Sequence, residues 1–347
     1  MTADQTLDRA TGAAAGPQAP TGRQVRLRRE GERRLAGLVR RGAAPVVLVL
    51  VVALGAVVFG DSFASAGNFA NIAISSSFLA LVAVGMTFVI ISGGIDLSVG
   101  SVLALGGVLA AYGSRWGSAG ALLLPLVVCG LIGLTQGLLI AKARMAPFIV
   151  TLAGLLFARG LALAVSDEGN TTYLIQSGML VGRLGQGTVL GVGLPVLFAL
   201  VAFAVGLVVL NRTRSGQAVF AIGGSQDAAE LMGLPVARIK VGIYVASGLL
   251  AGFAGVLVAA RSSSGLPTVG DGLELQAIAA VVIGGTLLSG GAGTLSGTLA
   301  GVLLLGVIQN LINQVGTLSS YYQQVVSGAF LIVVVIVQAW ISRRQRR

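Results

Sequence analysis

The sequence has few charged residues: only 10% of its 347 residues are Asp, Glu, Lys or Arg, whereas 55% are hydrophobic and 52 are glycine. Soluble domains carry about 25% charged residues, so a chain this poor in charge cannot cover an ordinary water-facing surface. The composition therefore excludes a soluble globular protein. It predicts an all-α, polytopic membrane protein, most of which lies in lipid.

Histidine is absent and Cys129 is the only cysteine. Without an acidic cluster, the chain lacks the ligand sets of zinc, haem and iron–sulfur sites, and it can form no internal disulfide. We therefore expect no cofactor and no metal, and Cys129 is expected to be a buried packing residue. The two lysines, Lys142 and Lys240, are followed by Ala and Val, so no GxxxxGK[ST] phosphate loop is possible. The chain is expected to hydrolyse no ATP.

Apolar stretches of about 20 residues, which cross roughly 30 Å of hydrocarbon, recur along the chain and predict ten spans. If both termini are cytoplasmic, the cytoplasmic segments hold all of the 23 Lys and Arg residues except Arg115, Arg159, Arg183 and Arg261. This asymmetry follows the positive-inside rule. The predicted spans lie near 44–60, 69–92, 97–112, 119–141, 147–165, 191–210, 241–260, 274–290, 294–312 and 322–341.

The chain is expected to divide into three parts. Residues 1–43 contain nine arginines and lack an apolar period, so they are predicted to be a disordered basic cytoplasmic tail. Residues 44–341 form the predicted transmembrane domain, and 342–347 a basic cytoplasmic C-terminus. We interpret the net charge of +11 as a topology signal and expect no nucleic-acid partner.

A carboxylate lies inside an apolar run in the sequence ISGGIDLSVGS at 91–101. At the centre of a continuous helix Asp96 would cost roughly 2.5 to 3.5 kcal/mol, so two membrane segments meeting at a Gly-rich break are the better interpretation. Asp96 has two compatible roles, as the N-cap of a helix from Leu97 onward or as a gate. The candidate gate or pathway residues at this joint are Gly93, Gly94, Asp96, Ser98 and Gly100.

A second Gly-rich stretch, VIGGTLLSGGA at 282–292, aligns with the first at an offset of 191, with five identities in eleven positions. Two interpretations stay open. The stretches are an internal repeat of broken helices, which transporters place near their pathway, or they are two tight turns that each need glycine. Either joint is a full turn or a re-entrant hairpin.

Polar residues fall at helical spacing in the second and ninth predicted spans. Because polar groups facing lipid would lack partners, both faces are expected to point into the protein. Whether they line a passage or join helices by hydrogen bonds stays open. They are Asn68, Asn71 and Ser75 in the second span, and Gln309, Asn310 and Asn313 in the ninth.

The longest predicted cytoplasmic loop between spans, 211–240, is expected to hold a short helix at 225–232. Ser225 can cap its start, Asp227 lies in its first turn, Gly233 can end it in the left-handed conformation, and Pro235 prevents continuation. A helix of about seven residues is too small for a domain. We interpret it as a segment that docks into the groove of a partner, with an ordinary structured loop as the alternative.

Three motifs, in this order, resemble the permeases of bacterial ABC sugar importers of the ribose, xylose and galactoside group, within the branched-chain/monosaccharide permease family. They are GGIDLSVGS at 93–101, AAELMG followed by VARIK at 228–240, and IAAVVIGGTLLSGGAGTLSGTLAG at 278–301. The likeness covers roughly residues 44–341. It implies a multi-pass permease that carries a monosaccharide, pentose or hexose, across a bacterial cytoplasmic membrane.

The same resemblance implies partners: a second permease copy, identical or a related paralogue, two cytoplasmic ATPase subunits that bind the ATP, and an extracytoplasmic sugar-binding protein, all within or beside membrane lipid. It also implies that the loop at 211–240 couples to the ATPase. Closure of the ATPases is then expected to push on the short helix and change the joints at 93–100 and 284–293. The candidate coupling residues are Ser225, Asp227, Ala228, Ala229, Glu230 and Gly233.

Two other classes of protein remain as alternatives. An ion-gradient-driven secondary transporter of a small polar solute would also be a bundle with broken helices. Such a transporter usually needs titratable groups at the midplane, where this chain offers Asp96 and few others. An intramembrane enzyme is the weaker alternative, because histidine and a paired carboxylate cluster are missing.

Overall fold

The computed structural model describes residues 44–176 and 178–315, with the single positions 322, 325, 328, 329, 332 and 336. All of them lie in one compact unit, Arg41–Arg347. The predicted tails at 1–43 and 342–347 lie outside the described residues, as does most of the tenth predicted span, so these predictions are untested.

The described part of the chain is a bundle of helices, which confirms the predicted all-α, polytopic class. A helix at Ala44–Phe59 comes first. The later helices are α2 Asp61–Ala64, α3 Ala66–Ile91, α4 Val99–Gly113, the 3₁₀ helix η1 Ser114–Trp116, α5 Gly117–Ala141, α6 Pro147–Val165, α7 Leu180–Gln186, α8 Leu194–Arg212, α9 Arg214–Gly224, α10 Gln226–Leu231, α11 Val236–Ser262, α12 Leu273–Ile283 and α13 Leu295–Val315.

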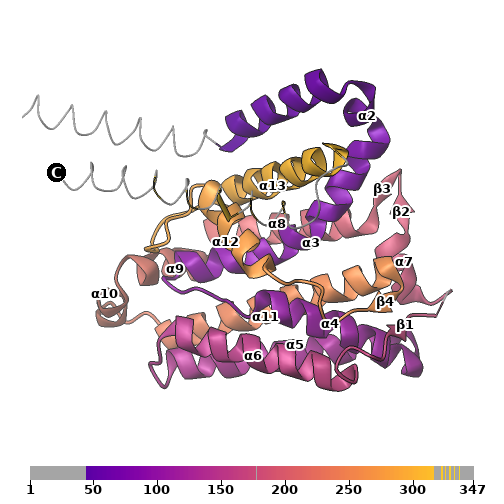
Figure 1. Cartoon of the computed structure of the whole chain (residues 1–347). Helices are drawn as coiled ribbons and strands as arrows, with labels where there is room; N and C mark the ends of the chain where they lie inside the picture. Colours follow the sequence, from indigo (N-terminus) through magenta and orange to yellow (C-terminus); the bar gives the residue numbers. More distant parts are fainter. Residues whose placement is uncertain are drawn as a thin grey trace, which may run out of the picture. The chain divides into compact units, whose positions relative to one another are not determined.

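Four two-residue strands form two small antiparallel pairs. Strand β1, Tyr173–Leu174, pairs with β4, Ser264–Gly265, and β2, Thr188–Val189, pairs with β3, Val192–Gly193. Figure 1 shows the strands and α7 at one end of the bundle and α10 at the other. We call these the strand end and the α10 end.

Six helical segments of the described chain are long and apolar enough to cross a membrane. They are Ala66–Ile91, Val99–Ala141 (α4, η1 and α5 taken together), Pro147–Val165, Leu194–Arg212, Val236–Ser262 and Leu295–Val315. Each of the first nine predicted spans coincides with a helix, but the count of ten and the orientation of the termini remain predictions. One boundary is wrong. The span predicted at 274–290 is helical only over α12, whose 11 residues extend about 16 Å, so α12 cannot cross the hydrocarbon alone.

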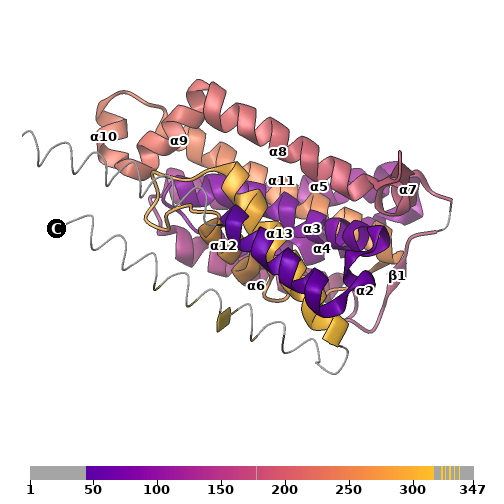
Figure 2. The same ribbon diagram turned by 90° about the horizontal axis from the view of Figure 1, so that it is seen from above.

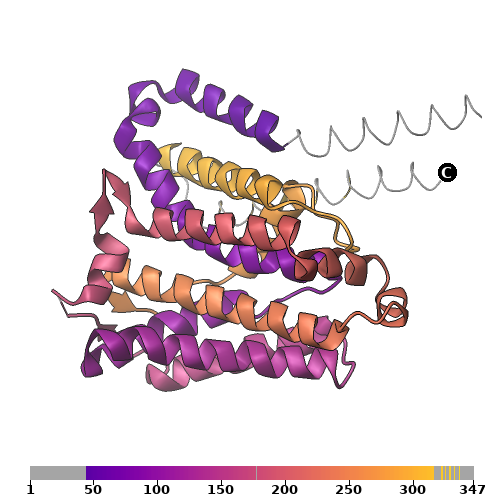
Figure 3. The ribbon, with the colours of Figure 1, turned by 180° about the vertical axis from the view of Figure 1, so that it is seen from behind.

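Helix α11 packs against α3, α4, α5 and α7, while α13 packs against α3 and α12. Viewed from above, α8 runs along one side of the bundle and continues into α9 and α10 (Figure 2). From behind, α8 lies between α11 and α13 (Figure 3), and the rings of Phe198 and Phe253 meet edge to face between α8 and α11.

Small residues bring α5 and α11 close together. A methyl group added at Gly252 would lie 2.6 Å from the Cβ atom of Cys129, and one added at Gly248 would lie 2.5 Å from the carbonyl oxygen of the same residue. Cys129 is fully buried, which confirms its predicted packing role. The thiol lies 3.6 Å from the Val102 carbonyl oxygen on α4.

Candidate functional site

The first joint is a break between two helices, as the sequence predicts. Helix α3 ends at Ile91, and Gly93 takes a φ of 83°, which favours glycine. The Gly94 N–H then donates to the Val89 carbonyl, 3.0 Å away, closing the turn. Helix α4 begins five residues later, at Val99.

Asp96 is the centre of a buried polar cluster at this joint. Its Oδ1 atom accepts hydrogen bonds from the Ser98 N–H (3.0 Å) and the Ser98 hydroxyl (2.6 Å), and its Oδ2 atom accepts one from the Ser247 hydroxyl of α11 (2.8 Å). Gln136 of α5 donates to Ser98 Oγ over 2.9 Å. The predicted helix start at Leu97 is wrong, because α4 begins at Val99 with Ser98 in the N-cap position and no side chain caps it. Asp96 instead accepts the Ser98 N–H in the turn before the helix and holds the joint to two other helices. We call Asp96, Ser98, Gln136 and Ser247 the Asp96 cluster.

The backbone around this cluster leaves little space. A methyl group at Gly94 would collide with the Tyr244 hydroxyl, and one at Gly154 of α6 would collide with the Gln136 amide. Both Asp96 and Ser98 are 1% exposed, and the buried Tyr244 hydroxyl has no hydrogen-bond partner among the described residues. Displacing the joint therefore requires α5, α6 or α11 to adjust.

The second joint links α12 to α13 through residues 284–294. Gly285 repeats the turn of Gly93, with a φ of 90° and an N–H that donates to the carbonyl three residues back. The turns therefore match at an offset of 192, one residue away from the best alignment of the sequences. Gly290 and Gly291 also have positive φ, 81° and 73°.

The two joints meet each other and the end of α9. The Gly291 N–H donates to the Ile91 carbonyl over 2.9 Å. A methyl group at Gly290 would lie 2.9 Å from the Gly93 Cα atom and 3.0 Å from the Gly223 carbonyl oxygen. A methyl group at Gly223 would collide with the Ile91 carbonyl oxygen and lie 2.5 Å from the Gly291 nitrogen. We call Gly93, Gly223, Gly290 and Gly291 the glycine contact, because three chain segments approach there backbone to backbone.

The predicted short helix is confirmed as α10, which is separated from α9 by the single residue Ser225. The Ser225 hydroxyl accepts a hydrogen bond from the Ala228 N–H (3.3 Å), and Gly233 takes the left-handed conformation with a φ of 77°. Helix α9 itself was not predicted; the Thr213 hydroxyl caps it by accepting from the Gly216 N–H. The sequence signal for this cap was a threonine three residues before a glycine, which is a weak one.

The candidate coupling residues gather on α10 but do not all face outward. Asp227, Ala228 and Glu230 are exposed, whereas Ala229 is buried against Ile222 and Val236. Ala229 therefore anchors α10 and cannot itself touch a partner. Two residues that the prediction missed, Leu231 and Met232, are 90% and 67% exposed and give this end of the helix an apolar tip.

The polar face of α3 meets that of α13 at one position. The side-chain amides of Asn68 and Asn310 exchange hydrogen bonds of 3.1 and 2.7 Å, and Gln309 donates to Gln276 of α12 over 3.2 Å. For the other three residues, the expectation that both faces point into the protein stays a prediction, because the single chain leaves them exposed. Asn71, Ser75 and Asn313 are exposed.

Comparisons with known proteins identify the family of this chain. The model of the family described as branched-chain amino acid transport system, permease component, matches residues 68–335. The chain belongs to this family. No solved structure matches it.

Individual permeases resemble it over most of their length. The ribose import permease protein RbsC of Haemophilus influenzae is 38% identical over 303 residues, which are 86% of this chain and 93% of the relative. RbsC of Bacillus subtilis is 41% identical over 292 residues, 84% and 89% of the two chains. The L-arabinose ABC transporter permease protein AraH of Azospirillum brasilense is 38% identical over 314 residues, 89% of each chain.

These matches confirm the predicted resemblance to sugar ABC permeases and the prediction of a transport permease. The relatives are named as import or transporter permease proteins. Together with the six apolar helices, the matches also confirm a multi-pass protein of the bacterial cytoplasmic membrane. An ion-gradient-driven transporter is not favoured.

Proposed function

We propose that this permease carries a monosaccharide through the membrane as part of an ATP-driven importer, in which two separate cytoplasmic ATPase subunits bind and hydrolyse the ATP and an extracytoplasmic binding protein delivers the sugar. The relatives named for ribose and L-arabinose import support this assignment. The missing phosphate-loop motif supports the separation of ATP hydrolysis from this chain. Two permease copies form the working unit, with the α10 end in the cytoplasm.

The glycine contact is the observation that best supports this mechanism. Helix α10 begins after Ser225, two residues beyond Gly223, and Gly223 touches the backbone of both joints. A partner that pushes on α10 therefore moves a segment in direct contact with Ile91 and Gly291. Because the contact is between backbones, no flexible side chain absorbs the movement. ATPase closure is thereby converted into rearrangement of both breaks.

The Asp96 cluster supplies the other half of the mechanism. It holds the first joint to α5 and α11, so displacement at Gly93 is opposed by the hydrogen bonds of Ser98, Gln136 and Ser247. Such an arrangement favours two discrete positions of the joint over a continuum. We assign gating to Gly93, Gly94, Asp96, Ser98 and Gly100 on this basis.

The exposed polar residues of α3 and α13 mark the passage between the two copies. Asn71, Ser75 and Asn313 are exposed although they lie on apolar helices. Polar groups are costly against lipid, so they face water or the second permease. Their hydroxyl and amide groups suit an uncharged, hydroxyl-rich solute.

The test is reconstitution in lipid vesicles. The permease together with its ATPase and binding protein is expected to accumulate D-ribose, L-arabinose or D-fructose inside vesicles oriented for import, only when ATP is supplied to the ATPase. The permease alone is expected to accumulate none of them. Accumulation by the permease alone, driven by a sodium or proton gradient, would overturn the proposal in favour of a secondary transporter.

Replacing Glu230 by lysine is expected to separate the permease from its ATPase. Glu230 is exposed on α10, and reversing its charge at a docked surface places like charges together, which costs several kcal/mol, or about a hundredfold in affinity. Co-purification of the ATPase with the permease measures the loss. Thermal unfolding of the permease in detergent is expected to stay unchanged, because an exposed side chain contributes little to stability.

The control for this variant concerns Arg144, whose guanidinium lies 3.5 Å from the Glu230 carboxylate. An exposed ion pair is worth roughly 0 to 1 kcal/mol. The exchange of charges, Glu230→Arg with Arg144→Glu, keeps this pair but still reverses the charge on α10. The exchange is expected to leave ATPase binding impaired; full recovery would show that Glu230 acts only through Arg144 and contradict its docking role.

A further inference from the structure

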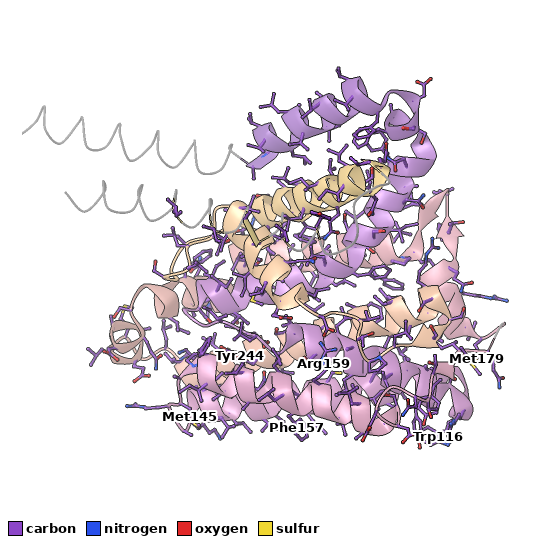
Figure 4. The ribbon with its side chains drawn as sticks, in the orientation of Figure 1. Trp116, Met145, Phe157, Arg159, Met179 and Tyr244 are labelled. Atoms are coloured by element: carbon purple, nitrogen blue, oxygen red, sulfur yellow. The ribbon has the colours of Figure 1, made fainter. Side chains whose placement is uncertain are left out.

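Helix α6 carries a charged residue inside a membrane span. Arg159 lies three residues from the midpoint of Pro147–Val165, which is about 5 Å along the helix axis. Its side chain is only 21% exposed, forms an ion pair with Asp271, and donates to the Pro267 carbonyl. Figure 4 labels Arg159 and Phe157 partway along α6, and Phe157 is 62% exposed. A charge at this depth is costly in free energy unless it is paired, and charged residues that are kept there usually have a function.

The partner of Arg159 lies on irregular backbone. Residues 266–272 run from strand β4 to the start of α12, and Gly270 and Gly272 have φ values of 86° and 75°. Because Asp271 touches Arg159, this segment reaches the same depth in the bundle. Irregular backbone at membrane depth occurs only where protein covers it or where it faces water.

Among the described residues, the segment is covered only in part. The Asp271 side chain is 60% exposed in spite of its ion pair, Leu275 is 52% exposed, and Thr268 is also exposed. Lipid cannot satisfy an exposed carboxylate. The exposed side of the segment therefore faces water within the assembled transporter.

The same segment is packed against the first joint. A methyl group at Gly270 would lie 2.6 Å from the Gly100 carbonyl oxygen, and one at Gly100 would collide with the Glu274 carboxylate. Glu274 thus lies beside the first turn of α4, where the positive end of the helix dipole favours a carboxylate. Movement of the first joint changes the position of Glu274.

Amide groups extend this polar region toward the faces described above. Gln276, in the first turns of α12, hydrogen-bonds to Gln309 of α13, and the neighbouring Asn310 pairs with Asn68 of α3. Carboxylates are strong acceptors for hydroxyl groups, and a glutamine amide both donates and accepts. Two carboxylates against one guanidinium disfavour an anionic solute.

We infer that residues 266–275 line a site for an uncharged polyhydroxyl solute, in which Asp271 and Glu274 hydrogen-bond to the solute hydroxyls and Arg159 positions Asp271. The inference rests on the proposed function and adds to it a place within the membrane where the sugar is held. Because Glu274 also touches Gly100, the site changes when the first joint moves. Sugar is thereby bound and released in step with the gate.

Thiol labelling tests the exposure of the site to water. The variants Asp271→Cys and Thr268→Cys, in the complete importer, are expected to react with a membrane-impermeant charged methanethiosulfonate about tenfold or more faster than Phe157→Cys, since thiol reactivity needs access to water. Phe157 lies two residues from Arg159 on an exposed face of α6, so it is a depth-matched control, and the native Cys129 is fully buried. Thr268 carries no charge and keeps the test valid if Asp271→Cys fails to fold. Equal, slow labelling at all three positions would overturn the inference.

Sugar selectivity tests the contact with the solute. In the reconstituted importer, Glu274→Gln and Asp271→Asn are expected to raise the KM for uptake and to change the ratio of D-ribose to D-fructose transport by about threefold or more, because each sugar presents its hydroxyls differently. A merely structural role would lower all rates in proportion, and an unchanged ratio with unchanged KM would overturn the contact. If the wild-type importer carries none of the sugars, the proposed function fails, while the labelling result still decides whether this segment faces water.

Discussion

Replacement of Gly223 by alanine is expected to reduce sugar uptake by the reconstituted importer strongly while the ATPase still binds. The added methyl group would overlap the Ile91 carbonyl oxygen and lie 2.5 Å from the Gly291 nitrogen, both backbone atoms that cannot rotate away. Overpacking of this kind typically costs about 1 to 3 kcal/mol, and the cheapest relief is separation of α9 from the two joints. Uptake per ATP hydrolysed is the quantity to measure, and we expect a loss of about tenfold or more, since about 1.4 kcal/mol corresponds to a factor of ten.

The neighbouring glycine provides a matched control. A methyl group at Gly224 would meet nothing within 4 Å, and Gly224 does not have a positive φ. Gly224→Ala is therefore expected to transport like the wild type, although it makes the same change one residue closer to α10. If Gly223→Ala also transported normally, or if both variants failed equally, close approach at Gly223 would not be the route from α10 to the joints.

Replacement of Asp96 by alanine is expected to destabilise the permease and to stop transport. The substitution leaves the Ser98 N–H and the hydroxyls of Ser98 and Ser247 without their acceptor in a site that is 1% exposed. A buried group left unsatisfied costs about 1 to 3 kcal/mol, so we expect a clear fall in the thermal midpoint of the detergent-solubilised protein. Normal expression, stability and sugar uptake by Asp96→Ala would show that neither the capping nor the gating role matters.

Two further variants separate stability from gating at this position. Asp96→Asn keeps one acceptor oxygen for Ser98 and offers Ser247 a donor, so it is expected to recover most of the stability. Ser247→Ala combined with Asp96→Ala is expected to cost less than the sum of the single changes, because both remove the same hydrogen bond. Additive effects would show that Ser247 is not part of the cluster.

Local signals in the sequence predicted the features that depend on neighbouring residues. Ser225 and Gly233 located α10 because capping and left-handed termination act within a few residues. Asp96 between glycines located the first joint for the same reason: the cost of a carboxylate in an apolar run is visible in one short segment. That cost is the reason to predict that the helix is interrupted at this position.

The features that the sequence did not reveal are contacts between distant segments. Gln136 and Ser247 are 38 and 151 positions away from their partners in the Asp96 cluster, and a serine or glutamine in an apolar helix does not indicate which neighbour it meets. Asp271 was missed for a different reason. A predicted span at 274–290 placed it in a loop beyond the membrane, whereas the shortness of α12 brings it to the depth of Arg159.

The glycine contact consists of backbone atoms, which determines how the transporter responds to the pH and the salt concentration of its medium. Uncharged amides have no proton to gain or lose near neutrality, and dissolved ions screen only charges. The step from α9 to the joints should therefore be the same in dilute and concentrated salt and from mildly acidic to mildly alkaline medium. The proposed attachment of the ATPase through the exposed charges of Asp227 and Glu230 is open to screening. We therefore expect the ionic strength to change how many complexes form but not the amount of sugar that each complex carries per cycle.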